Sequence, residues 1–406
     1  MFRSSMAPHD KVLIESVKTH LNPNLVQGTA IKQLVRETPQ AVESAFERPT
    51  EWTEAAFSPK ILRCVAQMSG VVFLGKAKID YSAWYKLTSE FVINASRAVV
   101  VLREQHPLLR PLIHWFLPEC RIIRQQSREA RKLIEPAILE RLNELSRQDG
   151  GEKVNEAMVS IDWFTACVQS NHLRNFDFVS AEFTLAIASI RTVSSHVFAG
   201  IIRLAMHPEC MARIREEIIA VLKCTAKLDK ACLFRMRLLD SFLKESARLN
   251  CFPTTLRRMV LEDVRFSDGT LLPKGTYCMV APPPMKDSAC YGPDAAEFDG
   301  FRYVKLRENA VAKGSSGEQY QYCSVSNHDT IFGLGVHVCP ARFFATFQVK
   351  ILVAYMLLHY DMKLPRGDMG KPLMRTDGYE RSIDHYRNLQ FMVRQPEIDW
   401  QSLMEK

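Results

Sequence analysis

Residues 329–347 read DTIFGLGVHVCPARFFATF, and this stretch decides how the rest of the chain is interpreted. Its one cysteine, Cys339, follows a run punctuated by Gly333 and Gly335 and precedes an apolar helical pattern that begins near Pro340. A cysteine where a loop enters a helix meets backbone N–H dipoles, which favour the thiolate. The two glycines let the backbone approach a flat, bulky group. From these residues alone, Cys339 could be a structural cysteine, a metal or haem ligand, or a nucleophile.

The composition is that of an ordinary globular protein. The 406 residues are 47% hydrophobic and 24% charged, with a formal net charge of +8. Charges of both signs are interspersed, which predicts a slightly basic, solvated surface and no nucleic-acid partner, although an acidic protein partner stays open. Eleven dispersed cysteines without a CxxC pair argue against a disulfide scaffold or a zinc finger, and favour reduced thiols in a cytosol-facing compartment.

Helical periodicity dominates the chain up to about residue 252. The longest apolar run, residues 183–206, contains Arg191, His196 and Arg203, so it predicts a buried core helix and not a membrane span. From about residue 253, β-branched residues alternate with Asp-Gly and Pro-Lys-Gly turns, which is typical of short strands and hairpins. A last long helix is expected from Pro340 or Ala341. The predicted fold class is mainly α with a small β portion.

The segment FGLGVHVCPARFFA resembles the haem-binding loop of the cytochromes P450, the haem-thiolate monooxygenases. That loop runs Phe-x-x-Gly-x-(Arg/His)-x-Cys-x-Gly. The resemblance implies that Cys339 is the axial ligand of the iron of haem b, and that Phe332 packs beside the cysteine loop. It also implies that His337 lies where a haem propionate is held. Ala341 stands where the family usually has glycine.

A second match lies in LKESARLN, residues 243–250, where Glu245 and Arg248 share one helix face at a spacing that supports an ion pair. Alone, this spacing is common on solvated helices. In its place along the chain, however, it resembles the family's Glu-x-x-Arg, which pairs with an arginine from a later irregular segment. The segment FDGFRYVK supplies that arginine as Arg302. The implied role is structural, a buried charge triad whose rupture costs several kcal/mol.

A third match is ASIRTV, residues 188–193, which stands where the family has Ala/Gly-Gly-x-(Asp/Glu)-Thr. The resemblance gives Thr192 the position of the threonine whose hydroxyl helps to deliver protons to bound dioxygen. The alternative is a hydroxyl that bonds back to its own helix. Arg191 replaces the usual acid.

Two weaker matches concern the haem propionates. TTLRRMVLED, residues 254–263, resembles the strand whose arginine reaches a propionate, and Arg258 fits the spacing better than Arg257. VLIESVKTHLNP resembles the helix that carries Trp-x-x-x-Arg. Here Ile14 replaces the tryptophan and Lys18 replaces the arginine. Each of the two cations could instead be an ordinary solvated side chain.

The resemblance as a whole implies a single cytochrome P450 domain over residues 1–406, of the fungal secondary-metabolism type. It begins at the family's third main helix, so we expect an N-terminally truncated fold that lacks the membrane anchor, the first helix and much of the larger sheet. Full-length relatives are expected at the endoplasmic reticulum membrane. This chain shows no transmembrane anchor.

The implied activity is a haem-dependent monooxygenation that hydroxylates or epoxidises a lipophilic secondary metabolite of terpenoid or alkaloid type. Dioxygen would be the co-substrate, NADPH-cytochrome P450 reductase would supply the electrons, and the protein would be a monomer. One alternative is a truncated, non-catalytic P450 remnant with weak or no haem binding. Another is a helical structural protein without a cofactor.

Overall fold

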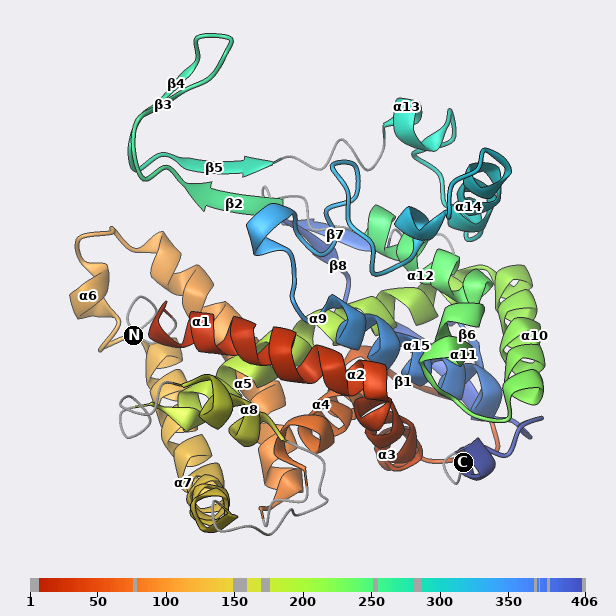
Figure 1. Ribbon diagram of the computed structural model, residues 1–406, viewed down its shortest axis with the longest axis horizontal. Helices are drawn as coiled ribbons and strands as arrows, with labels where there is room; N and C mark the ends of the chain where they lie inside the picture. The colour runs from red at the N-terminus through yellow and green to blue at the C-terminus, as the bar shows by residue number, and fades with distance from the viewer. Residues whose placement is uncertain are drawn as a thin grey trace.

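The computed structural model describes most of the chain. The described residues are 7–75, 79–148, 159–168, 176–250, 255–280, 287–368, 371, 373–377 and 380–403. Helices make up most of them and short strands lie towards one side and the top (Figure 1). The prediction of a mainly α fold with a small β portion is therefore confirmed.

The first half of the chain is helical. Its elements are α1 (Ala7–Ser16), η1 (Val17–Leu21), α2 (Asn22–Gln27), α3 (Thr29–Phe46), α4 (Phe57–Leu74), α5 (Tyr81–Glu104), α6 (Arg110–Ile113), α7 (Pro118–Gln148) and α8 (Ser160–Cys167). The segment η1 is a single stretch of π-helix between α1 and α2. Such bulges often mark functional positions in a helix.

The second half carries the central helices. They are α9 (Phe178–Met206), α10 (Pro208–Thr225), α11 (Lys230–Arg235), α12 (Arg237–Leu249), α13 (Ser288–Tyr291), α14 (Arg302–Ala312), η4 (Glu318–Tyr320), η5 (Gly335–His337), α15 (Arg342–His359) and η6 (Gln401–Leu403). The last long helix thus begins at Arg342, one or two residues later than the Pro340 or Ala341 that the sequence pattern predicts.

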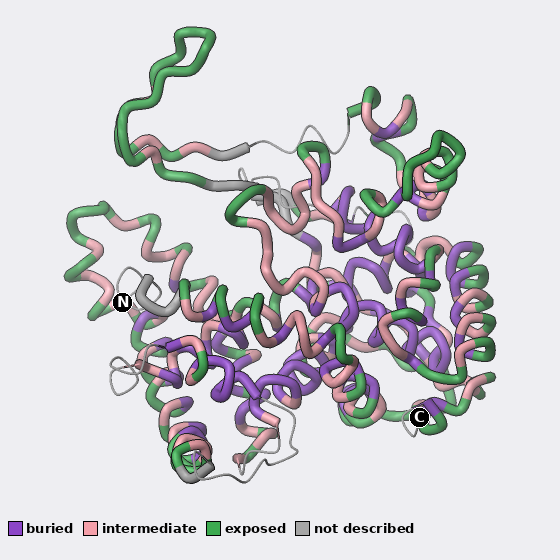
Figure 2. The backbone as a smooth tube through the Cα atoms, viewed as in Figure 1, coloured by how far each residue is buried: buried purple, intermediate pink, exposed green. Residues whose placement is uncertain are grey.

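The strands form small antiparallel sheets. The three-stranded sheet has the order β1 (Thr53–Ala56), β9 (Asn388–Val393), β6 (Tyr360–Lys363). The two-stranded pairs are β2 (Thr255–Met259) with β5 (Tyr277–Val280), β3 (Val264–Arg265) with β4 (Leu271–Leu272), and β7 (Met374–Asp377) with β8 (Glu380–Ile383). Figure 2 shows that the β3–β4 hairpin extends away from the body and is exposed along its length.

Helices α9 and α15 form the centre of the core. Residues 346–359 of α15 are all buried, and α15 packs against α9, which also packs against α4 and α12 (Figure 2). Helix α9 begins at Asp177, whose carboxylate accepts the N–H of Ser180 as an N-cap. Of the described helices, α9 alone is long and apolar enough to cross a membrane, and 67% of its most apolar window is buried in the protein. The predicted core helix is therefore found.

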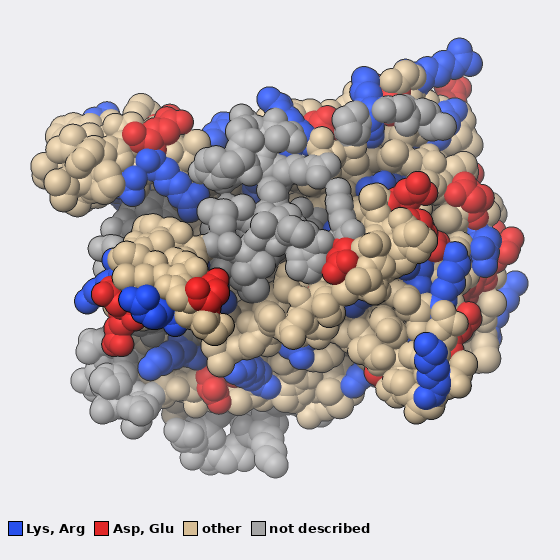
Figure 3. All heavy atoms as spheres, turned by 90° about the horizontal axis from the view of Figure 1, so that it is seen from above, with Lys and Arg blue, Asp and Glu red and all other residues tan. Residues whose placement is uncertain are grey.

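The charged side chains are mixed on the face seen from above. Lysine and arginine side chains are interspersed there with aspartate and glutamate among a larger area of uncharged residues (Figure 3). This distribution agrees with the interspersed charges of the sequence.

Candidate active site

The loop before α15 has a conformation that needs glycine. The backbone N–H of Cys339 donates to the carbonyl of Phe332 at 2.7 Å, which closes the loop. Gly333 has φ of +80°, and a Cβ there would lie 2.9 Å from the carbonyl oxygen of His337. A side chain at residue 333 would therefore be strained and would push the loop open. The glycine pattern in the sequence is thus explained by the path of the chain around the cysteine.

The thiol of Cys339 is half-buried at the entrance to α15. Burial raises the pKa of Cys339, while the N–H of Ala341 and the charge of Arg342 act in the opposite direction. A bound metal cation stabilises a thiolate far more strongly than these neighbours do. The donor chemistry and the glycine-dependent approach of the backbone therefore fit a haem iron.

Ala341 takes the position where the family usually has glycine. Its φ is −93°, an ordinary value for any L-residue, so this backbone does not require glycine. The methyl group at this position consequently adds no backbone strain to the loop.

Helix α9 presents an open face beside this loop. Ala188, Arg191 and Thr192 are exposed, although most of the helix around them is buried. The hydroxyl of Thr192 donates to the carbonyl of Ala188 at 2.7 Å, which is the back-bonding arrangement that the sequence left as the alternative. His196, one turn further on, stacks on the ring of Phe332. The exposed residues of α9 therefore lie one helical turn from a side chain that contacts the cysteine loop.

Glu245, Arg248 and Arg302 come together in the core, as the motif predicts. Arg248 donates to both carboxylate oxygens of Glu245, at 2.7 Å each, and Arg302 donates to Oε1 at 3.1 Å. The backbone N–H of Asp299 is a further donor to Glu245, at 3.1 Å. Arg248 also donates to the carbonyl of Ala295 at 2.6 Å. Glu245 therefore ties α12 to the irregular segment before α14.

A second buried charge network, which the sequence analysis missed, joins the same helices to the cysteine loop. The ammonium of Lys244 lies 2.6 Å from a carboxylate oxygen of Asp329, at the start of the loop. Lys350 of α15 lies 2.8 Å from Asp240 of α12, whose other oxygen accepts the N–H of Tyr322 at 2.9 Å. The lysine inside the apolar run of α15 was the available signal, because a charge there needs a buried partner.

The three residues expected at the propionates carry exposed side chains. His337 lies in η5, Lys18 in the π-helical turn η1, and Arg258 in strand β2. Asn22, at the end of that π-helical turn, donates to the carbonyl of Pro340 at 3.2 Å. The helix that carries Lys18 is therefore attached to the cysteine loop. No sequence motif predicted this contact.

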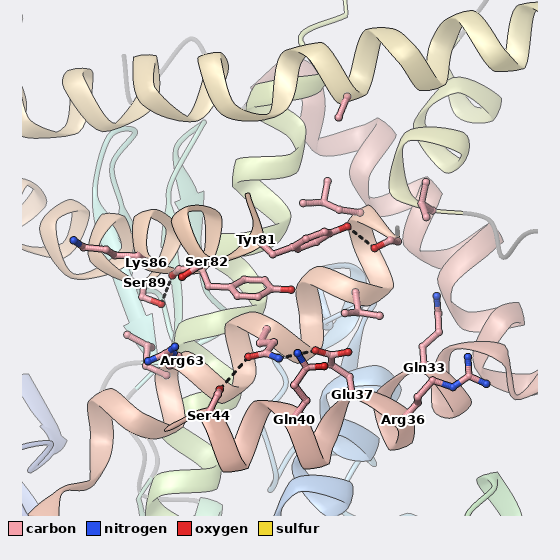
Figure 4. Close-up of a pocket in the computed structure, with 18 of the residues that line it drawn as sticks. Gln33, Arg36, Glu37, Gln40, Ser44, Arg63, Tyr81, Ser82, Lys86 and Ser89 are labelled. Atoms are coloured by element: carbon pink, nitrogen blue, oxygen red, sulfur yellow. Dashed lines mark hydrogen bonds between the residues drawn. The ribbon is translucent and has the colours of Figure 1, made fainter. Parts of the chain in front are cut away.

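A separate cavity of about 1520 Å³ lies among α3, α4, α5, α7 and α8. Figure 4 shows Glu37 and Gln40 of α3 facing Tyr81 of α5 across it. A chain of hydrogen bonds runs from Ser44 through Gln67 to Glu37 at its base. None of the residues predicted for the haem site lines this cavity, so it is distinct from the site described above.

Known proteins resemble the chain over almost its whole length. The family model for cytochrome P450 matches residues 14–385. The chain is 33% identical over 375 residues to the cytochrome P450 monooxygenase bsc2 of Alternaria brassicicola, covering 92% of this chain and 70% of that protein. It is 32% identical over 394 residues to the cytochrome P450 monooxygenase adrA of Penicillium rubens, covering 95% and 74%.

A third relative is the cytochrome P450 monooxygenase TRI1 of Fusarium sporotrichioides, 33% identical over 369 residues, with 90% of this chain and 65% of that protein covered. Among solved structures, a retinoic acid-bound cyanobacterial CYP120A1 matches with a TM-score of 0.65 and 16% identity, over 95% of this chain and 78% of that one. This likeness shows the fold. The chain belongs to the cytochrome P450 family, as a haem-thiolate monooxygenase of the kind found in fungal secondary metabolism.

Proposed function

We propose that the protein hydroxylates or epoxidises a lipophilic secondary metabolite of terpenoid or alkaloid type, with dioxygen and with electrons from NADPH-cytochrome P450 reductase. The observation that carries the proposal is the closed loop that joins Cys339 to Phe332 beside the open face of α9. The fungal relatives named as cytochrome P450 monooxygenases support the reaction type. We further propose that residues 1–406 form a single domain, that the protein is a monomer, and that it faces the cytosol.

Each predicted site residue has a role in this proposal. Cys339 ligates the iron of haem b, and Phe332 holds the cysteine loop closed through its carbonyl and its ring. His337, Arg258 and Lys18 bind the haem propionates with their exposed polar groups. When bound, the haem supplies the chemistry that activates dioxygen.

The protein's own part in the reaction is orientation and proton supply. The hydroxyl of Thr192 donates its single hydrogen to Ala188, so its oxygen is free to accept a hydrogen bond from the open side of α9. Glu245, Arg248 and Arg302 hold α12 against the haem-side segment and take no part in the reaction.

Ligation by Cys339 is tested by the spectrum of the reduced protein with carbon monoxide. A strongly red-shifted Soret band is expected for the wild type and is expected to disappear in Cys339→Ser. Cys278→Ser, which removes a half-buried cysteine on β5, is the matched control and should keep the band. Persistence of the band in Cys339→Ser would show that another residue ligates the iron.

The oxygenation itself is tested by incubation with NADPH, the reductase and a panel of terpenoids and alkaloids under labelled dioxygen. Incorporation of one labelled oxygen atom into the product is expected. Arg191→Asp restores the family's acid beside Thr192 and is expected to increase the fraction of oxygen consumption that ends in product. Absence of the red-shifted band in the wild type, together with absence of product from every panel member, would favour the alternative of a non-catalytic P450 remnant with weak or no haem binding.

A further inference from the structure

Three aromatic residues meet at the cysteine loop: His196 of α9, and Tyr322 and Phe332 from the segment before Cys339. The hydroxyl of Tyr322 and Nδ1 of His196 are 2.5 Å apart, in a hydrogen bond between residues 126 positions apart in sequence. The imidazole of His196 stacks on the ring of Phe332, with ring centres 6.0 Å apart and planes 9° apart. The ring of Tyr322 also packs against the ring of Phe332, with ring centres 5.8 Å apart. The three rings therefore form one contact group.

The backbone of Tyr322 and that of His196 are each held by the surrounding structure. Tyr322 is 1% exposed, and its backbone N–H is held by Asp240 of α12. His196 belongs to α9, four residues after Thr192, so the two side chains project from the same helix face. Burial lowers the pKa of His196 to about 4, so the imidazole stays neutral near neutral pH and the stack carries no charge. The hydrogen bond with Tyr322 sets the rotation of the imidazole ring.

The stack acts on the cysteine through Phe332. The ring of Phe332 is held by His196 and Tyr322, and its carbonyl accepts the N–H of Cys339 at 2.7 Å. The ring and the carbonyl belong to one residue, so packing that fixes the ring also restrains the backbone that carries this carbonyl. On the other side of the cysteine, Asn22 holds the carbonyl of Pro340. Cys339 is therefore fixed from both sides, and α9 provides one of the two supports.

We propose that His196 and Tyr322 are positioning residues for Cys339, and that they couple the helix face carrying Thr192 to the loop that ligates the haem iron. The proposal rests on the proposed function, since it assigns to the pair the task of keeping the thiolate in its ligating position. The competing explanation is a core hydrogen bond that adds stability and nothing else.

The test uses four variants. Tyr322→Phe removes only the hydroxyl, His196→Phe keeps a ring to stack on Phe332, and the double variant combines them. His196→Gln replaces the imidazole by an amide that can still bond to Tyr322. The control is Tyr360→Phe, because Tyr360 is also 1% exposed and loses a hydrogen bond of 2.7 Å to the carbonyl of Glu47, away from the cysteine loop.

The first readout is the rate at which the reduced carbon monoxide complex loses its red-shifted Soret band and takes on the band of neutral-thiol haem. Tyr322→Phe and His196→Phe are each expected to raise this rate about fivefold, because each removes one hydrogen bond. The double variant should be no faster than the faster single variant, since both remove the same bond. His196→Gln should recover part of the wild-type rate, and Tyr360→Phe should leave it unchanged.

The second readout does not depend on haem. It is the rate at which a maleimide alkylates Cys339 in haem-free protein, located by mass spectrometry, and the two single variants should raise it by a similar factor. Wild-type rates in both variants, with urea midpoints lowered as in Tyr360→Phe, would overturn the proposal. Absence of the red-shifted band in the wild type would instead count against the proposed function, and the alkylation rates would still decide the role of the pair.

Discussion

Two buried glutamates in neighbouring helices show how differently the same side chain can be accommodated. Glu245 of α12 is 0% exposed and accepts hydrogen bonds from two guanidinium groups and one backbone N–H. Glu182 of α9 is 1% exposed, and the hydroxyl of Ser160 is its hydrogen-bond partner. Its second oxygen, Oε2, has no partner among the described residues.

The consequence for Glu182 is a change of protonation state. Burial raises the pKa of Glu182 to about 8, so the carboxyl is largely protonated near neutral pH. The hydroxyl of Ser160 also lies 2.6 Å from the carbonyl of Phe73, and it has only one hydrogen to donate. A protonated Glu182 can donate to Ser160, which then donates to Phe73. Burial thus neutralises the carboxyl that lacks cationic partners, whereas Arg248 and Arg302 provide the opposite charge for Glu245.

The largest effect is expected from Glu245→Gln, which removes the buried carboxylate that Arg248 and Arg302 share and leaves Arg302 with Asp294 as its remaining acidic partner. We expect the free energy of unfolding to fall by about 3–5 kcal/mol, the cost of an unpaired buried charge. This is a large part of the stability of an average protein. Urea unfolding followed by circular dichroism measures the loss. A decrease below about 1 kcal/mol would mean that the triad contributes as little as a surface pair.

The second effect is a pH dependence that comes from Glu182. Its pKa is about 8 in the folded protein and 4.5 in the reference state, so the folded protein holds a proton that the unfolded chain has released. The contribution of this bound proton to the free energy of unfolding is therefore fully present at low pH, and it is lost as the pH rises towards about 8. At about 1.4 kcal/mol per unit of pKa, the loss is on the order of 4 kcal/mol.

Glu182→Gln should remove this contribution, because glutamine cannot ionise. Unfolding free energies of the wild type and the variant, measured from about pH 5 to about pH 8, should diverge in slope, with the wild type falling more steeply. The slope is the readout, since the buried amide of glutamine adds a cost that does not depend on pH. Parallel curves would contradict the protonation of Glu182.

The two glutamates also differ in whether their partners could be predicted from the sequence. Glu245 and Arg248 are three residues apart on one helix turn, so the spacing alone places them together, and the family motif adds Arg302. The loop around Cys339 could also be predicted from the sequence, because the backbone of that loop requires its glycines. Helix content and the buried helix α9 followed from apolar periodicity.

The pairs that the sequence could not predict join residues far apart in the chain. Ser160 and Glu182 lie on different helices, the His196–Tyr322 bond spans 126 residues, and the Asn22–Pro340 contact spans 318. Such contacts depend on how helices pack, which periodicity does not specify. The roles of His337, Arg258 and Lys18 stay predictions from the resemblance, and the structure shows that their side chains are exposed.

A smaller effect is expected from Ser160→Ala, which sharpens the description of the Glu182 site. The variant leaves both Glu182 and the carbonyl of Phe73 without the hydroxyl that joins them. We expect a loss of about 1–2 kcal/mol in the free energy of unfolding, the usual cost of an unsatisfied buried polar group. Ser146→Ala, which removes an exposed hydroxyl bonded within α7, is the matched control and should lose less. Equal losses in the two variants would show that Ser160 does not satisfy Glu182.

The smallest effect is expected from a bidentate ion pair with the same sequence spacing as Glu245 and Arg248, but more exposed to solvent. Arg394 donates to both carboxylate oxygens of Glu397 at 3.1 and 2.8 Å, again at a spacing of three residues. Here the side chains are 20% and 37% exposed, against 0% for both residues of the buried pair. Water can replace the partner, so Glu397→Gln should cost about 0.5 kcal/mol or less in urea unfolding. Both pairs are bidentate and three residues apart, so the difference between Glu245→Gln and Glu397→Gln chiefly measures burial and the second cationic partner, Arg302, of Glu245. Similar losses in both variants would mean that the geometry of the pair, and not its removal from water, determines its contribution.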